Sequence, residues 1–229
     1  VEGRRAAADR FAEAIDSLRE DRGQTMRVAA SLTIAEHLLP EWIARWRNSV
    51  GESGPLVQLA AANSNAVIEA VRTGDADLGF IETPDVPSDL SSVVVARDTI
   101  EVVVPRGHPW AKTGRVSIRE LANTRLVLRE AGSGTRQAFE SALSAAGSPL
   151  DAEPAGVFTT TLGVRSAIMT GVAPGALSSL AIDADLSTGR LIRVQIRNHR
   201  ISRPLSAIWA GSAPSRVTRD FLDLGLPEG

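Results

Sequence analysis

A regular alternation of short apolar strands with amphipathic helices constrains the fold of this chain more than any other feature of its sequence. In the first half, strand-like segments at residues 26–30, 55–61 and 75–82 are separated by helical patterns at 31–47 and 63–74. Strands that alternate with helices of ~10–15 residues predict a parallel sheet with crossover helices on its faces. We therefore expect the first half to form an α/β layer structure.

The same rhythm restarts after a long apolar strand at 98–105. The later segments are predicted as strands at 125–128, 155–158, 190–196 and 203–211, as a strand leading into a short helix at 175–182, and as helices at 135–146, 161–170 and 215–224. No low-complexity linker separates the two halves. The pattern predicts two similar α/β lobes that are joined by strands.

Local signals set several of the expected helix boundaries. Thr33 and Glu36 fit a capping box, in which two side chains satisfy free backbone N–H groups at a helix start. Pro40 lies inside the helical pattern at 31–47 and should kink or restart that helix. Gly74 is expected to end the second helix.

The composition argues against several classes of function. The chain has no cysteine, which excludes disulfides, thiol nucleophiles and thiolate metal sites. Its 25 basic and 27 acidic residues give a net charge of −2, which is not the balance of a nucleic-acid binder. No apolar run approaches the ~20 residues that span a bilayer. The charged N-terminus does not resemble a signal peptide, so we expect no membrane partner.

Catalytic and metal-binding motifs are not evident in the sequence. His37, His108 and His199 lie far apart and form no zinc-binding pattern. The Gly-Ser-Gly-Thr segment at 132–135 lacks the lysine of a phosphate-binding loop and does not fit a nucleophile elbow. We therefore expect no catalytic residues, no metal and no cofactor.

Hydroxyl and amide side chains recur where a predicted strand passes into a helix, at four places in the two halves. The carboxyl ends of parallel strands face the crevice in which open α/β sheets bind ligands. Helix starts also carry free N–H groups that attract anions, and glycine lets the backbone approach a ligand closely. Together these junctions predict a cleft for a small anion, although each is also explained by ordinary helix capping. The candidate residues are Ser31, Thr33, Asn63, Ser64, Ser133, Gly134, Thr135, Thr159, Thr160 and Thr161.

The N-terminal segment forms a further amphipathic pattern. Ala8, Phe11, Ile15 and Leu18 recur at helical spacing over residues 4–20. An isolated helix of this length is marginal in water, so the apolar stripe must pack against something. It could pack on its own domain or pair with a second chain.

A series of segments resembles the effector-binding domain of LysR-type transcriptional regulators. These are MRVAASLTIAEHLLPEWIARWR, NSNAVIEAVRTGDADLGFIE, DTIEVVVPRGHPWA, VSIRELANTRLVLREAGSGTRQAFE, MTGVAPGAL, STGRLIRVQI and RPLSAIW. Their order and spacing fit the family from about residue 24 to 224. The resemblance implies a fold like that of type 2 periplasmic binding proteins, with two Rossmann-like α/β lobes joined by crossover strands.

The resemblance also implies a division of the chain. Residues 1–22 would be the end of a linker and dimerisation helix, with the DNA-reading winged helix-turn-helix domain absent. Lobe 1 would comprise residues 24–101 and 205–229, and lobe 2 would comprise 102–204. Such a domain would form a homodimer or higher homo-oligomer in the cytoplasm and would contact DNA only through the missing domain.

Family resemblance further implies that a small-molecule effector binds between the lobes at the hydroxyl-rich junctions. Arg203 matches a family arginine, but a structural ion pair would explain it equally well. The turn at Gly171–Pro174 departs from the family pattern because its second glycine is absent. A solute-binding protein of a transporter shares the implied fold and is the main alternative, while an enzyme is a third possibility.

Overall fold

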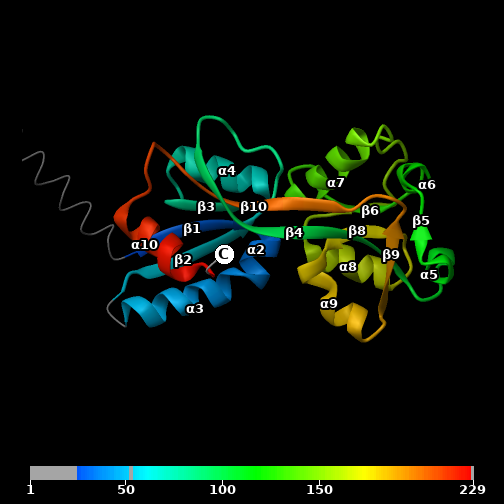
Figure 1. Ribbon diagram of the computed structural model, residues 1–229, viewed down its shortest axis with the longest axis horizontal. Helices are drawn as coiled ribbons and strands as arrows, with labels where there is room; N and C mark the ends of the chain where they lie inside the picture. The colour runs from blue at the N-terminus through cyan, green and yellow to red at the C-terminus, as the bar shows by residue number, and fades with distance from the viewer. Residues whose placement is uncertain (1–24, 52–53, 228–229) are drawn as a thin grey trace, which may run out of the picture.

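The computed structural model describes residues 25–51 and 54–227. The N-terminal segment 1–22, for which we predicted a linker helix, lies outside the described residues. The described chain forms two lobes that lie side by side along the long axis of the molecule (Figure 1). Two long strands, β4 (Ser91–Pro105) and β10 (Ile201–Trp209), run through both lobes and connect them.

Within the described residues, a single twisted sheet of ten strands extends through both lobes. Its strand order is β2-β1-β3-β10-β4-β8-β6-β7, with β9 beside β4 and β5 beside β9. In the first lobe, β1 is parallel to both β2 and β3. In the second lobe, β6 is parallel to both β7 and β8. The connecting strands β4 and β10 are antiparallel to each other and to their neighbours β8 and β3.

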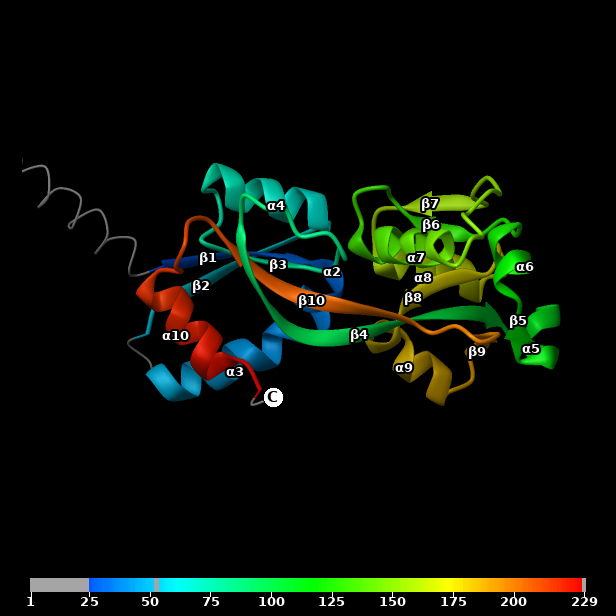
Figure 2. The same ribbon diagram turned by 45° about the horizontal axis from the view of Figure 1, so that its top comes forward.

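The first lobe holds the earlier elements of the chain and its final helix. They are β1 (Thr25–Ser31), α2 (Leu32–His37), α3 (Leu39–Val50), β2 (Leu56–Ala62), α4 (Ser64–Thr73), β3 (Leu78–Ile81) and α10 (Arg216–Gly225). Helix α4 covers one face of the sheet, and α3 and α10 cover the other (Figure 2).

The second lobe holds the remaining elements. They are α5 (Pro109–Thr113), β5 (Arg115–Val116), α6 (Ile118–Ala122), β6 (Val127–Arg129), α7 (Gly134–Ala145), β7 (Gly156–Phe158), α8 (Thr161–Met169), β8 (Gly175–Ser178), α9 (Ser179–Ser187) and β9 (Leu191–Ile196). Helices α7 and α8 pack on opposite sides of its sheet (Figure 1).

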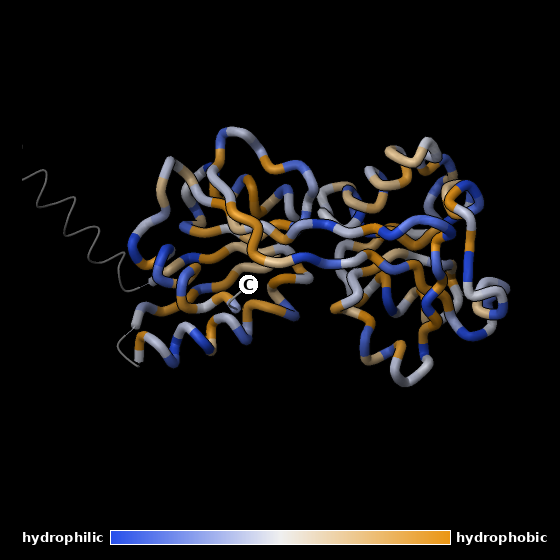
Figure 3. The backbone as a smooth tube through the Cα atoms, in the orientation of Figure 1, coloured by the Kyte–Doolittle hydropathy of each residue, from blue (hydrophilic) through white to orange (hydrophobic). Residues whose placement is uncertain are grey.

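Apolar strands with helices on both sides give each lobe two hydrophobic cores. Hydrophobic stretches run through the strands inside each lobe, while β4 and β10 are more hydrophilic where they pass between the lobes (Figure 3). Because successive strand residues point to opposite faces, Val102 and Val104 pack on one side of β4 while Val103 packs on the other. In the first lobe, Phe80 packs against Trp42 and Phe221, with ring centroids 5.7 and 6.3 Å apart.

The predicted fold class is confirmed, with local corrections. The helical pattern at 31–47 divides at Leu38, and Pro40 lies in the first turn of the restarted helix α3. The predicted Thr33–Glu36 capping box is wrong: Ser31 is the N-cap residue of α2, and the Thr33 hydroxyl donates to Glu82 instead. Strand β4 begins at Ser91, seven residues before the predicted start at Asp98.

The two connecting strands form a paired hinge between the lobes. Arg203 of β10 lies directly opposite Asp98 of β4 in the strand register, and the register shifts between Leu205 and Ser206. The lobe boundaries predicted at 101/102 and 204/205 fall within these two strands.

None of the helices in the ranges 25–51 and 54–227 combines the length and apolar character required to cross a membrane.

The aromatic core of the first lobe generates a stability prediction. Phe80 is fully buried between Trp42 and Phe221. Replacing it by alanine leaves a cavity, so we expect Phe80→Ala to lower the free energy of unfolding by about 3–5 kcal/mol in urea titrations. Leu224→Ala is the control, because Leu224 is exposed and its loss should change stability by less than about 0.5 kcal/mol. Equal effects of the two substitutions would contradict the described packing.

Candidate functional site

The carboxylate of Glu82 is the centre at which residues from both lobes meet. Glu82 directly follows β3 in the first lobe and is only 2% exposed. Four of the predicted site residues contact it: Thr33 and Ser64 from the first lobe, Thr135 from the second, and Arg203 from the hinge. The name Glu82 cluster is used below for five residues: Glu82, Thr33, Thr135, Arg203 and Asp98.

Both oxygens of the Glu82 carboxylate accept hydrogen bonds. The backbone N–H of Thr33 donates to Oε1 at 2.9 Å. The hydroxyls of Thr33 and Thr135 each donate to Oε2 at 3.1 Å. The guanidinium of Arg203 forms an ion pair with the same oxygen at 2.6 Å. These donor groups of Thr33, Thr135 and Arg203 form an anion cradle around the carboxylate.

Arg203 is held in place by a second carboxylate. Its Nε and Nη2 atoms donate to Oδ2 of Asp98 at 2.9 and 2.6 Å. Its Nη1 also donates to the Thr135 hydroxyl at 3.0 Å. That hydroxyl therefore accepts from Arg203 while it donates to Glu82. The hydroxyl of Ser179, at the start of α9, donates to the other oxygen of Asp98 at 3.1 Å.

The Glu82 cluster is buried and carries more acidic than basic groups. One guanidinium faces two carboxylates, which gives a formal charge of −1 when all three are ionised. Burial by itself raises the pKa of Glu82, but the charge of Arg203 and the hydroxyls of Ser31, Thr33 and Thr135 outweigh that effect and leave its pKa below the ordinary value. The ionised carboxylate is thus the form that this site stabilises.

Two glycines allow the lobes to touch beside the cluster. A Cβ atom at Gly134 would lie 2.6 Å from the Ser64 hydroxyl and 2.7 Å from the backbone nitrogen of Thr83. A Cβ atom at Gly132 would lie 2.9 Å from the Asn63 side chain. In the described structure the group that approaches these glycines is the other lobe, and their approach to a ligand stays a prediction.

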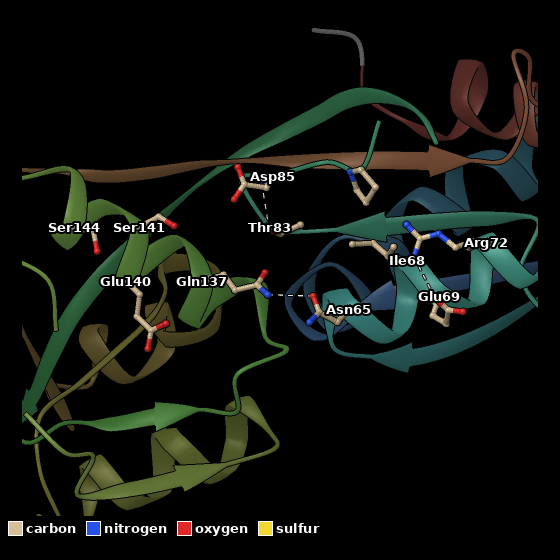
Figure 4. A pocket seen from close by; sticks show the side chains of 11 residues that line it. Asn65, Ile68, Glu69, Arg72, Thr83, Asp85, Gln137, Glu140, Ser141 and Ser144 are labelled. Atoms are coloured by element: carbon tan, nitrogen blue, oxygen red, sulfur yellow. Dashed lines mark hydrogen bonds and ion pairs between the residues drawn. The ribbon is translucent and has the colours of Figure 1, made fainter. Parts of the chain in front are cut away.

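Direct contacts between the lobes extend along the same edge. The backbone N–H of Asn65 donates to the carbonyl of Gly132 at 3.3 Å. The side chain of Gln137 donates to the Asn65 side chain at 3.1 Å, as Figure 4 shows. The junctions after β2 and β6, which were predicted to face one cleft, therefore face each other.

The remaining candidates of the first lobe have different roles. Asn63 caps α4 by accepting the N–H of Ala66 at 3.0 Å. The Ser64 hydroxyl accepts the N–H of Glu82 at 3.2 Å. Ser31 is buried, and its hydroxyl is near enough to the Glu82 carboxylate to lower the pKa of that group, although no hydrogen bond of ordinary geometry joins them within the described ranges.

The candidates of the second lobe divide into two groups. Ser133 is buried at the N-cap position of α7 but forms no capping bond through its side chain, which contradicts the simple capping interpretation. Thr159 and Thr160 precede α8, and Thr161 is its first residue. The Thr160 hydroxyl caps that helix at Gly163, and Thr161 accepts from Arg129 at 3.2 Å. Within the described residues, no hydrogen bond joins these threonines to the Glu82 cluster.

The sequence interpretation missed Glu82, Asp98 and Ser179. Glu82 and Ser179 directly follow the buried strands β3 and β8, and Asp98 is the first buried residue of β4. A carboxylate directly after the fully buried strand LGFI was the available signal, since a buried charge requires a partner.

A groove of about 710 Å³ runs between the lobes next to the cluster (Figure 4). It begins at Thr83, the residue after Glu82, and lies between α4 and α7. Its acidic lining consists of Glu69, Asp85 and Glu140. Arg72 also lines it, but this guanidinium is engaged by Asp89 and Glu69.

No group of three or more histidine, aspartate or glutamate side chains within residues 25–51 and 54–227 is arranged to hold a metal ion.

Comparison of the sequence with known proteins identifies the family of this chain. The family described as "LysR substrate binding domain" matches residues 19–227. An uncharacterised HTH-type transcriptional regulator of Mycobacterium tuberculosis is 46% identical over 223 residues, which cover 94% of this chain and 72% of the relative.

Two solved structures share the fold at low sequence identity. The CcmR regulatory domain of Synechocystis in complex with 2-PG has a TM-score of 0.76 at 22% identity, covering 88% of this chain and 95% of that one. The effector-binding domain of QuiR in complex with shikimate has a TM-score of 0.77 at 13% identity, with the same coverage.

The contact between the lobes at Gly134 can be tested with a single methyl group. Because a Cβ atom there would overlap Ser64 and the backbone at Thr83, we expect Gly134→Ala to lower the melting temperature and to increase the radius of gyration in small-angle scattering. Gly107→Ala is the matched control, since a Cβ atom at Gly107 meets no described atom within 4 Å. An unchanged scattering profile and melting temperature for Gly134→Ala would show that the lobes do not touch there in solution.

The low pKa of Glu82 makes its contribution to stability dependent on pH. A carboxylate whose folded-state pKa is depressed stabilises the fold above the unfolded-state value, about 4.3 for glutamate, and this contribution disappears as the pH falls through the folded-state pKa. We expect Glu82→Gln to be less stable than the parent at pH 7, with a gap that narrows below about pH 4.3 in urea titrations. A gap that stays constant with pH would contradict the ionised form assigned to Glu82.

Proposed function

The chain belongs to the LysR substrate-binding domain family, and we propose that it senses a small anionic effector held between its two lobes by Thr33, Thr135 and Arg203. The domain is the ligand-sensing part of a transcription factor. The complexes of CcmR with 2-PG and of QuiR with shikimate support a small-molecule effector. The proposal that this effector is an anion rests on the geometry of this chain.

The anion cradle is the observation that carries the proposal. A backbone N–H, two hydroxyls and a guanidinium converge on a single carboxylate from both lobes and from the hinge. Hydrogen bonds from charged or well-oriented donors to an ionised acceptor are among the stronger polar contacts in proteins. A site with this donor set is built to recognise an oxyanion.

Signalling would follow from the position of the cradle. Thr33 belongs to the first lobe and Thr135 to the second, so a ligand that contacts both favours one arrangement of the lobes. A ligand shifts such an equilibrium only by its difference in affinity for the two arrangements. Attached DNA-binding domains would read the arrangement, and the protein would act in the cytoplasm, where the DNA is located.

The alternatives have less support. HTH-type transcriptional regulators that are 46% and 31% identical to this chain argue against a transporter component and against an enzyme. A phosphonates import ATP-binding protein is also 33% identical over 210 residues, but the match covers only 41% of that relative. The hydroxyls of Thr33 and Thr135 also form hydrogen bonds with Glu82 and Arg203 inside a buried cluster. Among the described residues, no histidine forms a hydrogen bond to either hydroxyl that could activate it for catalysis.

A homodimer is part of the proposal. The edge strand β2 exposes Leu56 and Leu59, and the opposite edge of the sheet exposes Val157 on β7 and Leu162 on α8. Exposed apolar side chains on a sheet edge are suited to burial against another copy of the chain.

The dimer is tested by placing a charge on this edge. We expect the parent chain to have about twice the 24.2 kDa chain mass in light scattering at micromolar concentration. Leu59→Glu should shift the mass toward that of a monomer, while Leu224→Glu on α10, also at an exposed position, should not. A parent chain that stays monomeric at every concentration would refute the dimer.

The effector site is tested by removing one cradle hydroxyl. Candidate carboxylates, phosphates and sulfate are first screened by thermal shift, since a ligand that binds the folded state raises the melting temperature. A hydrogen bond to a charged group contributes about 1.5–3 kcal/mol, so Thr135→Val should weaken binding of the effector by roughly 10- to 150-fold in calorimetry.

Thr160→Val is the matched control for this experiment. Its hydroxyl caps α8 and does not contact the Glu82 cluster, so the variant should lose some stability but keep its affinity. If Thr135→Val lost stability alone and kept its affinity, the Thr135 hydroxyl would be structural and the proposed site would be wrong.

A further inference from the structure

We propose that Glu82 is a tethered competitor of the effector: its carboxylate occupies the anion cradle, and an effector binds there only by displacing it. This inference rests on the proposed function and deepens it. It makes Glu82 the residue that sets how strongly an oxyanion must bind in order to be sensed.

The first argument is that Glu82 satisfies the cradle. Its two carboxylate oxygens accept all four contacts from Thr33, Thr135 and Arg203, at 2.6 to 3.1 Å. The donors on which the proposed effector would depend are therefore already engaged by a carboxylate of the chain itself. An external carboxylate of the same shape would make the same contacts, so the two occupants exclude each other.

The second argument is electrostatic. Arg203 already faces Glu82 and Asp98, both buried, which gives a formal charge of −1. A monovalent anion added beside Glu82 would raise this buried negative charge to −2, whereas a monovalent anion that replaces Glu82 leaves it unchanged. Because like charges in a buried site repel with little screening by water, replacement is the favoured route.

The third argument concerns the place that an anion would take. The neighbouring groove is lined by Glu69, Asp85 and Glu140, while its one arginine, Arg72, is engaged by acidic partners. The groove is therefore unsuited to a free anion. The anion cradle is the place between the lobes where an anion meets donors from both sides.

The proposal is tested by removing the competitor. Sulfate, phosphate and acetate are titrated into the parent chain and into Glu82→Ala by calorimetry at constant ionic strength. A site that is blocked most of the time has its apparent affinity reduced by the fraction of time that it is free. We expect Glu82→Ala to bind at least one of these anions at least about tenfold more tightly than the parent.

Three further variants locate the effect. Glu41→Ala on the exposed face of α3 makes the same change in charge and should bind anions as the parent does. Glu82→Gln keeps the side-chain volume and replaces Glu82→Ala if that variant does not fold. Adding Thr135→Val to Glu82→Ala should abolish the gain, because it removes a donor of the cradle.

The outcomes separate this inference from the proposed function. If the parent binds an anion at Thr135 and removing Glu82 does not tighten that binding, the competitor is refuted and the proposed function stands. If neither the parent nor either Glu82 variant binds any anion of the titration or of the wider screen, both are refuted. If the gain persists in the double variant, or appears equally in Glu41→Ala, the anion binds elsewhere and the inference is wrong.

Discussion

The arrangement of the lobes depends on one buried cation. Arg203 lies in the hinge without access to water, and it is stable there because Asp98 and Glu82 surround its guanidinium. Removing one partner from a buried ion pair costs far more than an exposed pair contributes, because a charge is then left without compensation. The lobes approach each other with Glu82 as the link, since its carboxylate also collects the hydroxyl of Thr135 from the opposite lobe.

Most of the fold could be predicted because its signals are local. The periodicity of α7, predicted at 135–146 and observed at Gly134–Ala145, depends only on neighbouring residues. Pro40 likewise marks the helix restart by its own geometry. The early start of β4 was missed because residues 91–97 are largely exposed and lack a clean apolar pattern. Its antiparallel pairing with β10 joins residues about a hundred positions apart, and no local pattern records it.

The site was only partly predictable, for a related reason. Hydroxyl residues at helix starts were found because capping chemistry has a sequence pattern, and Thr33 and Thr135 do reach the centre. Their partner Glu82 was not found, since its donors come from 49, 53 and 121 positions away. Gly132 and Gly134 lie where the two lobes touch, but a sequence does not reveal whether a ligand or the chain itself approaches a glycine.

The pairing of Arg203 with Asp98 across the two hinge strands has a mechanical consequence. Both residues belong to the strands that connect the lobes, so a rotation of the lobes about these strands would leave their ion pair in place. Thr33 and Thr135 belong to different lobes, so the same rotation would separate them. In the proposed exchange, the guanidinium would release one anion and bind another without changing its own position.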